Sequence, residues 1–141
     1  MNCKHQSRHI RIVTLLISLL STIAACDSES GTAYMPFITL VTRAELFDGQ
    51  RVGVIGYLAR APEPMEAVML YLTRDHATIH AIVGAIEVDA GADITSCLDS
   101  YVEVEGVYSS SDILRLSQVE QISLRHEGQR VGETCYQRGS L

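Results

Sequence analysis

The chain has 141 residues, in which 11 lysines and arginines face 17 aspartates and glutamates, so its formal net charge is −6. A protein that follows a nucleic-acid backbone presents a basic surface, because neutralising phosphates and releasing counterions supplies most of its affinity. The acidic balance therefore argues against nucleic acid as a partner. The sequence holds no tryptophan and only two phenylalanines, so we expect no large aromatic cleft.

The first 25 residues have the layout of a secretory signal peptide. Lys4, Arg8 and Arg11 form a basic segment, and an uncharged run of fifteen residues follows at positions 12–26. A transmembrane helix needs about 20 apolar residues, whereas this run at about 1.5 Å per residue would reach only about 22 Å. We therefore expect a cleaved signal helix over residues 1–25.

The end of this run, Ile23-Ala24-Ala25-Cys26, resembles the lipobox of bacterial lipoproteins. The resemblance covers residues 1–27 and implies that Cys26 becomes a lipidated first residue, with membrane lipid as the partner of the anchor. Asp27 resembles the sorting signal that keeps enteric lipoproteins at the inner membrane; where that rule does not apply, the outer membrane is expected. The chain would then work in the cell envelope and face the periplasm. An uncleaved anchor and cleavage without lipid stay open as alternatives.

Removing residues 1–25 takes away three basic and no acidic residues, which leaves 8 basic and 17 acidic side chains and a formal charge of −9. The remaining 116 residues allow one domain with a modest core. We expect the lipidated cysteine and a flexible tether over residues 26–35, the folded domain over 36–124, and a polar C-terminal tail over 125–141.

Two cysteines beyond Cys26, Cys97 and Cys135, remain in the processed chain. An even pair in an exported protein favours a disulfide. The alternative is a buried, unpaired Cys97 together with an unpaired Cys135 on the tail.

Alternating apolar residues predict five short strands. They cover residues 51–58, 68–72, 79–88, 101–108 and 113–124. Bulges or bends are expected at Gly84 and at Ser117-Gln118. In addition, Thr42 and Glu45 match a capping box, which predicts a helical turn over residues 43–47.

This pattern predicts a mainly β fold, a small five-stranded OB-like antiparallel barrel with one short helical turn, because closure removes the sheet edges. Segments 48–58, 70–72 and 101–108, with Cys97, resemble a family of uncharacterised OB-fold-like bacterial proteins over about residues 37–124. The resemblance implies the fold and no activity. Relatives often carry an aromatic residue near the end of the third strand, where this chain has Glu87.

Two pairs of chemistry-bearing residues are candidate sites. Glu103 and Glu105 share one strand face, and glycosidases use paired carboxylates, but without an aromatic cleft we expect both to lie in water. His76 and His80 are four apart, a spacing that on a helix would let both bind a metal; His80, however, starts the predicted third strand. We therefore expect no enzyme, no metal and no cofactor.

Four tyrosines in or beside the predicted strands are the candidate ligand contacts: Tyr57, Tyr71, Tyr101 and Tyr108. OB-folds bind ligands across one barrel face, and tyrosine suits peptide or sugar contact as well as a partly wet core. The alternative is that all four pack the barrel.

The sequence as a whole favours a membrane-anchored, noncatalytic interaction module that holds an envelope protein, peptide or glycan. A structural or stress-related lipoprotein that supports envelope integrity is the alternative, and an envelope hydrolase is the least favoured function.

Overall fold

The structure, a computed structural model, describes residues 31–111, 113–126 and 129–139, with the backbone alone at 129–132. In chain order the elements are β1 (Ala33–Met35), α1 (Phe37–Thr42), the 3₁₀ turn η1 (Ala44–Phe47), β2 (Arg51–Arg60), β3 (Val68–Tyr71), α2 (Arg74–Thr78), β4 (Ile86–Val88), the 3₁₀ turn η2 (Thr95–Cys97), β5 (Ser100–Ser109), β6 (Arg115–His126) and β7 (Gln129–Gln137). The expected signal helix, Cys26 and Asp27 lie outside the described residues. No helix within the described ranges is both long enough and apolar enough to cross a membrane.

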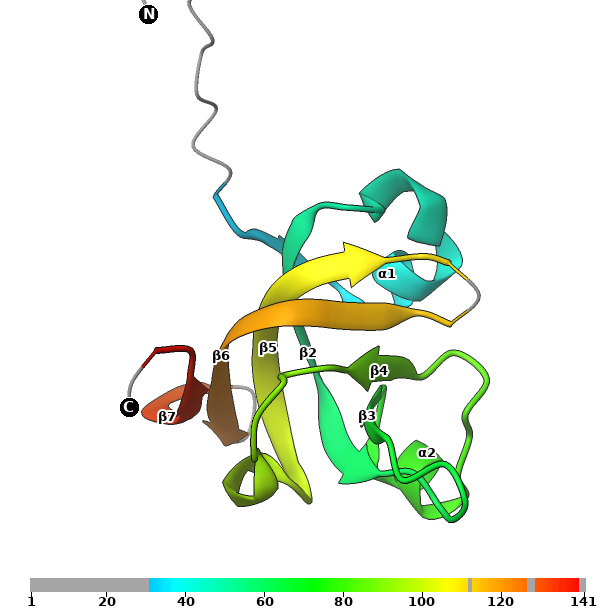
Figure 1. Ribbon diagram of the computed structural model, residues 1–141, viewed down its shortest axis with the longest axis vertical. Coiled ribbons are helices and arrows are strands. Elements are labelled where there is room, and N and C mark those ends of the chain that lie inside the picture. Colours follow the sequence, from blue (N-terminus) through cyan, green and yellow to red (C-terminus); the bar gives the residue numbers. More distant parts are fainter. Residues whose placement is uncertain (1–30, 112, 127–128, 140–141) are drawn as a thin grey trace, which may run out of the picture.

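Five strands close into a barrel in the order β2-β3-β4-β6-β5, with β5 pairing back onto β2 (Figure 1). All neighbours in this ring run antiparallel except β4 and β6, which are parallel. The order in the sheet therefore differs from the order along the chain, because β6 rather than β5 lies next to β4. The predicted mainly β fold with a five-stranded OB-like barrel is confirmed.

The barrel interior is built by the alternating apolar residues of the strands. Val52, Val54 and Leu58 of β2 are fully buried, and so are Val102 and Val104 of β5, the strand that pairs with β2. Their spacing of two residues is the strand period that puts side chains on one face. The inward faces predicted for these two strands are confirmed.

A bulge lies where β5 pairs with β6. The register shifts between Glu105 and Val107, opposite Gln118, whose φ is 47°. A Cβ at Gly106 would lie 2.8 Å from the carbonyl oxygen of Ser117, so glycine is the residue that permits this close approach of two backbones. The bulge predicted at Ser117-Gln118 is confirmed.

The helical turn predicted over residues 43–47 is present, but the capping interaction predicted for Thr42 is wrong. Residues 44–47 form η1, as expected, and a further helix, α1, precedes it. The Thr42 hydroxyl does not cap η1; it donates to the carbonyl oxygen of Ile38, 2.7 Å away and within α1. Phe37 and Leu40 of α1 are buried in the barrel core, so tertiary packing rather than the cap holds this short helix.

The third strand is much shorter than the predicted range 79–88, because only β4 pairs with its neighbours. Residues 79–85 form turns instead. His80 has a φ of 51° and Gly84 a φ of 82°, and both values turn the chain away from extended geometry. Gly84 is therefore a turn residue rather than a strand bulge. The alternation over this range misled because Ile82 is exposed.

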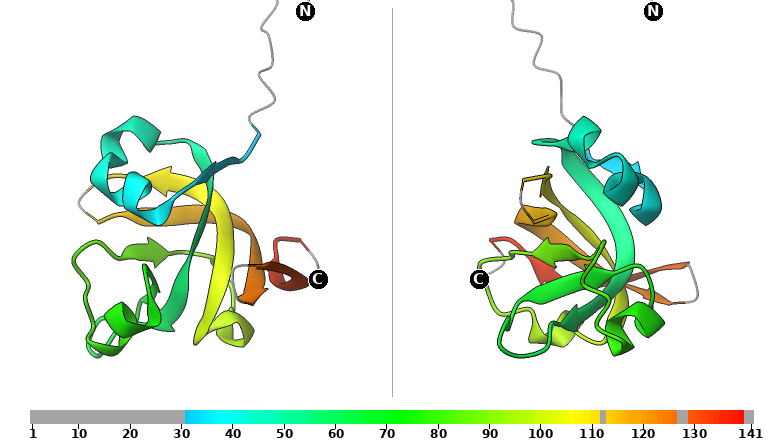
Figure 2. Two further views of the ribbon diagram at one scale, coloured as in Figure 1. Left: turned by 180° about the vertical axis from the view of Figure 1, so that it is seen from behind. Right: turned by 90° about the vertical axis from the view of Figure 1, so that its right-hand side faces the viewer.

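The helix α2 covers part of the outer surface of the barrel. Thr73 caps it by accepting from the His76 backbone N–H at 3.3 Å. Beneath it lies a second apolar cluster outside the barrel, the outer cluster: Tyr57, Ala59, Ala61, Met69, Tyr71, Ala77 and Ala85. As a result, β2 is buried on both faces over much of its length. Figure 2 shows α1 and α2 near opposite ends of this long, curved strand.

The tether expected over residues 26–35 is shorter than predicted at its C-terminal end. Residues 33–35 form β1, which pairs in parallel with β2 from Ala33 against Val52 to Met35 against Val54. Backbone hydrogen bonds to β2 hold this segment as a strand, although its sequence shows no alternation of apolar and polar residues.

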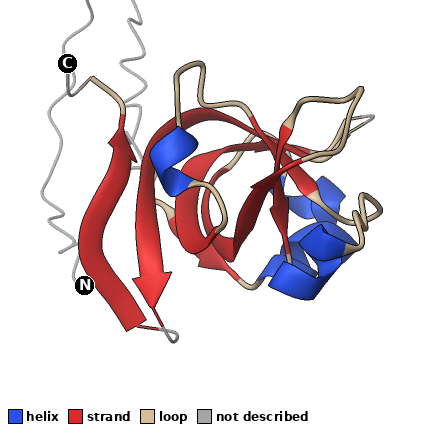
Figure 3. Ribbon diagram, turned by 90° about the horizontal axis from the view of Figure 1, so that it is seen from below, coloured by secondary structure: helices blue, strands red, loops and turns tan. Residues whose placement is uncertain are grey.

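The tail expected from residue 125 onward is also wrong within the described residues. The strand β6 continues to His126, and β7 pairs with it antiparallel (Figure 3). A disulfide joins Cys135 of β7 to Cys97 of η2, with a Cα–Cα distance of 5.5 Å. Tyr136 also packs against the barrel core, and its hydroxyl donates to the carbonyl oxygen of Ala90 at 3.1 Å. β7 is largely polar and has few side chains that face the core, so it shows little alternation of apolar and polar residues, and the sequence pattern did not predict it.

Candidate functional site

An open pocket of about 910 Å³ lies at the end of the barrel where β2 stops. We call it the arginine pocket. Its wall combines the end of β2, the helix α2, the start of β5 and the end of β6. The residues that line it include Tyr57, Arg60, Arg74, His80, Asp99, Tyr101 and Arg125.

The arginine pocket concentrates positive charge in an acidic chain. Three of the eight arginines that follow residue 25 line it, together with His80 and His126, whereas Asp99 is its one acidic lining residue. Arg60 and Arg74 are exposed, and neither forms an ion pair among the described residues. Arg60 does act on one carboxylate at longer range: hydrogen bonds from Thr95 and, to a smaller extent, the charge of Arg60 lower the pKa of Asp93. Exposed guanidinium groups that form no close ion pair are able to bind an anion.

Arg125 reaches the pocket from a buried ion pair. Its guanidinium binds the Glu103 carboxylate from the neighbouring strand, and the side chain of Glu103 is 2% exposed against 16% for Arg125. The Nε atom of Arg125 is buried and has no hydrogen-bond partner among the residues that the structure describes. A buried donor without an acceptor is unfavourable.

The prediction that Glu103 lies in water is therefore wrong. The alternation of β5 is correct, but the outward face at Glu103 is covered where β6 continues past the barrel toward Arg125. Glu105, two residues on, is half-buried and accepts from the Tyr34 hydroxyl at 2.9 Å. Both carboxylates weighed for hydrolysis thus have protein partners.

Two of the four candidate tyrosines form one wall of the pocket. The rings of Tyr57 and Tyr101 meet edge to face, with centroids 5.3 Å apart and an interplanar angle of 74°. Tyr101 is 41% exposed, and its hydroxyl oxygen accepts from the Arg74 backbone N–H at 3.2 Å. This bond ties the start of α2 to β5 and places Tyr101 next to Arg74.

The other two tyrosines are packing residues. Tyr108 is fully buried in the barrel, and its hydroxyl donates to the carbonyl oxygen of Leu40 at 3.3 Å. Tyr71 is 1% exposed in the outer cluster. Burial raises the pKa of both hydroxyls above that of free tyrosine, as expected when the charged form is desolvated. Neither lines the arginine pocket.

Strained backbone frames the pocket on two sides. Four described residues other than glycine have positive φ, and two of them, His80 at 51° and Asp99 at 55°, line the arginine pocket. Aspartate and histidine tolerate this region better than most residues, and such conformations gather at functional sites.

The disulfide is linked to the same wall. Leu98 and Asp99, which line the pocket, directly follow Cys97 of η2. The cysteines that the sequence pairs, Cys97 and Cys135, thus join β7 to the segment that shapes the pocket.

The histidines weighed as metal ligands are not brought together. The Nδ1 atom of His76 lies 2.6 Å from the Thr73 hydroxyl, whereas His80 lies in the turn after α2 and lines the arginine pocket. Throughout the described ranges, no three histidine, cysteine, aspartate or glutamate side chains gather closely enough to hold a metal ion.

Sequence reasoning missed the three arginines of the pocket. They stand at positions 60, 74 and 125, and no short motif connects them. The signal that could have found two of them is the strand register. Tyr57 pairs with Tyr101 between β2 and β5, and Val102 pairs with Leu124 between β5 and β6. These pairings bring the ends of β2 and β6, which carry Arg60 and Arg125, to the same end of the barrel.

Comparison with known proteins adds no family to these observations. No protein-family model, no curated protein and no solved structure matches the chain.

Proposed function

We propose that this protein is a noncatalytic binding module that holds an anionic ligand in the arginine pocket. The observation that carries the proposal is the gathering of Arg60, Arg74 and Arg125 in one open pocket of an acidic chain. Carboxylate and phosphate groups match the planar, forked donors of arginine. The Tyr57 and Tyr101 rings add an apolar surface with polar tips, which suits a peptide or a glycan.

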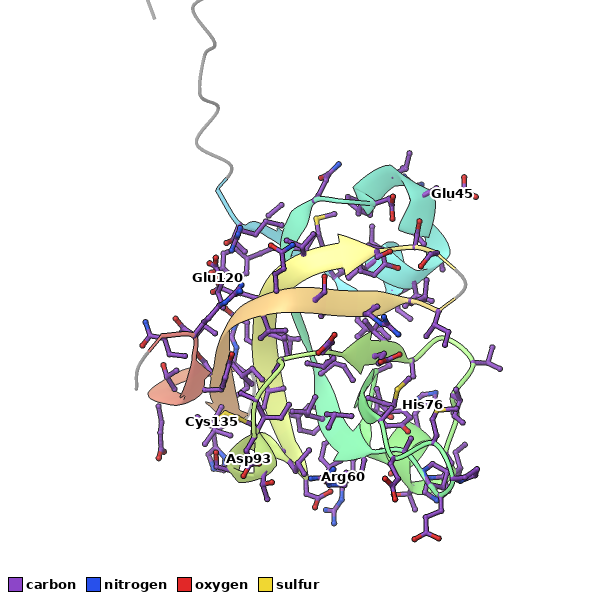
Figure 4. All side chains as sticks on the ribbon, in the orientation of Figure 1. Glu45, Arg60, His76, Asp93, Glu120 and Cys135 are labelled. Carbon is purple, nitrogen blue, oxygen red and sulfur yellow. A yellow bond between two sulfur atoms is a disulfide. The ribbon has the colours of Figure 1, made fainter. Side chains whose placement is uncertain are left out.

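We further propose that the module is a lipid-anchored protein of the cell envelope. The lipobox-like residues 23–26 support this, with Cys26 as the lipidated residue and Asp27 as the sorting residue. Figure 4 places Arg60 at the end of the molecule opposite β1. An anchor preceding β1 would therefore join the domain at the end opposite the arginine pocket, which leaves the pocket free to meet ligands of the periplasm.

The anchor has a direct test in the intact mass of the protein extracted from its native membranes. We expect a chain that starts at Cys26 and carries two or three acyl groups, and a gain of two hydrogens on reduction of the disulfide. A full-length, unmodified chain would contradict the lipoprotein proposal and leave the pocket proposal standing.

The pocket proposal predicts that two arginine substitutions weaken anion binding. The probes are citrate, inorganic phosphate and a tetraglutamate peptide, measured by titration calorimetry at low salt. Each exposed charge contributes up to about 1 kcal/mol, so Arg60→Gln with Arg74→Gln should lower the affinity for the best probe about tenfold. Added salt should weaken binding to the wild type, because both groups are exposed to screening.

The matched control removes two positive charges elsewhere, with Arg43→Gln and Arg138→Gln, which are exposed and do not line the pocket. It changes the net charge by the same amount. Equal losses in the two double variants would reduce the effect to overall charge and contradict a specific site.

A further inference from the structure

The wall of the arginine pocket carries a carboxylate among its cations. Asp99 is exposed and is the acidic residue among those that line the pocket. Its backbone N–H donates to the carbonyl oxygen of Leu58 at 2.8 Å, two residues before Arg60 on β2. This bond places Asp99 beside the end of the strand that carries Arg60. A ligand that brings only negative charge would be attracted by the arginines and repelled by Asp99.

Two hydroxyl groups of the wall add further acceptors. The Thr78 hydroxyl donates to the carbonyl oxygen of Arg74 at 3.1 Å, and the Ser100 hydroxyl donates to that of Leu98 at 3.2 Å. A hydroxyl has one proton to donate, so toward a ligand each of these oxygens can only accept. Thr78 is exposed, Ser100 is half-buried, and both line the pocket. The wall therefore matches a ligand that combines negative charge with hydrogen-bond donors.

Among the described strands, those of the wall have no open edge for an extended peptide. At Tyr57 and Leu58, β2 is paired with β3 on one side and with β5 on the other. At Val102, β5 is paired with β2 and with β6. A peptide that joins a sheet needs an unpaired strand edge, so recognition at this wall falls to side chains.

Tyr101 offers a flat surface beside these polar groups. It is 41% exposed, and its ring rests edge to face on that of Tyr57. Tyrosine combines an apolar ring with a polar tip. A sugar ring has apolar C–H faces and hydroxyl donors around its rim, and in an acidic sugar it also carries a carboxylate.

We propose that the arginine pocket selects an acidic glycan. The uronate carboxylate binds Arg60 and Arg74, and a sugar ring lies against Tyr101. Hydroxyl groups of the sugar donate to Asp99, which makes Asp99 a specificity-determining residue, because a donor turns it from a repulsive group into a hydrogen-bond acceptor. This inference rests on the proposed function of the pocket and adds the class of its ligand.

The test compares trigalacturonate with an acetylated and amidated triglutamate peptide on the full-length protein. Both probes carry three carboxylates at neutral pH, but only the sugar brings hydroxyl groups. We expect titration calorimetry at one fixed ionic strength to show trigalacturonate binding about tenfold tighter, as a net hydrogen bond to a charged acceptor implies.

The variant Asp99→Asn separates attraction from repulsion at this position. Asparagine keeps the shape of the side chain and tolerates the φ of 55° found here, but a neutral amide accepts a hydroxyl proton more weakly than a carboxylate does. Binding of trigalacturonate should weaken about threefold or more. Binding of triglutamate should instead strengthen about twofold, because a like charge is removed.

The matched control is Asp93→Asn. Asp93 is exposed and does not line the pocket, yet hydrogen bonds from Thr95 and, to a smaller extent, the charge of Arg60 lower its pKa. The variant therefore removes a negative charge that Arg60 feels and leaves the wall unchanged. Both probes should bind it at least as tightly as they bind the wild type.

The outcomes separate the ligand class from the pocket itself. Triglutamate binding as tight as that of trigalacturonate, or tighter binding of both probes in Asp99→Asn, would overturn the glycan assignment in favour of an acidic peptide and leave the pocket standing. Failure of both probes to bind the wild type would overturn the proposed function together with this inference.

Discussion

Reduction of the bond between Cys97 and Cys135 is expected to lower the free energy of unfolding by about 4 kcal/mol, from the entropy of closing the loop. The two cysteines are 38 residues apart in sequence, and the bond restricts the unfolded chain over that whole distance. In the folded chain it fastens β7, which otherwise depends on its pairing with β6 and on contacts with η2.

Urea unfolding of the oxidised and reduced proteins measures this difference. Cys97→Ser and Cys135→Ser should each lose at least as much stability as reduction does, and the double variant should lose little beyond the less stable single variant, because the bond can be broken only once. Equal midpoints for the oxidised and reduced wild type would contradict a stabilising role of the bond.

Replacing Arg125 by methionine is expected to cost about 3 kcal/mol or more, because it strands the Glu103 carboxylate in the interior without its partner. Glu103 is 2% exposed, so water cannot take the place of the guanidinium. Adding Glu103→Leu to Arg125→Met should recover most of the loss, since replacing a whole buried pair by apolar residues is often neutral or stabilising.

The matched control is Arg115→Met. Arg115 pairs with Glu87 at 3.1 Å, and the two side chains are 44% and 22% exposed. A pair this open to solvent should be worth less than about 1 kcal/mol. A loss in Arg115→Met as large as that in Arg125→Met would show that burial of Glu103 is not what makes its pair important. Because Arg125 also lines the arginine pocket, binding is better tested at Arg60 and Arg74.

Sequence periodicity predicted the barrel well wherever a strand has one face in the core. The alternation around Val54 and Val104 identified β2 and β5 and their inward faces. It failed over residues 79–85, where alternating apolar residues are exposed in turns, and for β7, whose pairing depends on backbone hydrogen bonds and a disulfide. Both errors have one cause, because periodicity reports burial and these segments are stabilised by other contacts.

The candidate site could be predicted only in part. Tyr57 and Tyr101 were chosen for their chemistry, and the register of β2 and β5 brings their rings together. Tyr71 of β3 and Tyr108 of β5 have the same chemistry but are packed inside the protein, Tyr71 in the outer cluster and Tyr108 in the barrel core. This difference depends on where α2 and α1 cover the barrel. The three arginines carry no local signal, since a pocket built from the ends of separate strands exists only after the barrel closes.

Mapping amide chemical-shift changes on addition of tetraglutamate tests the central claim most directly. We expect chemical-shift changes that saturate and that cluster around Arg60, Arg74, Tyr101 and Arg125. These residues lie at the end of β2, the start of α2, the start of β5 and the end of β6. Changes that do not saturate, or that centre on another face of the barrel, would contradict the assignment of the arginine pocket as a binding site.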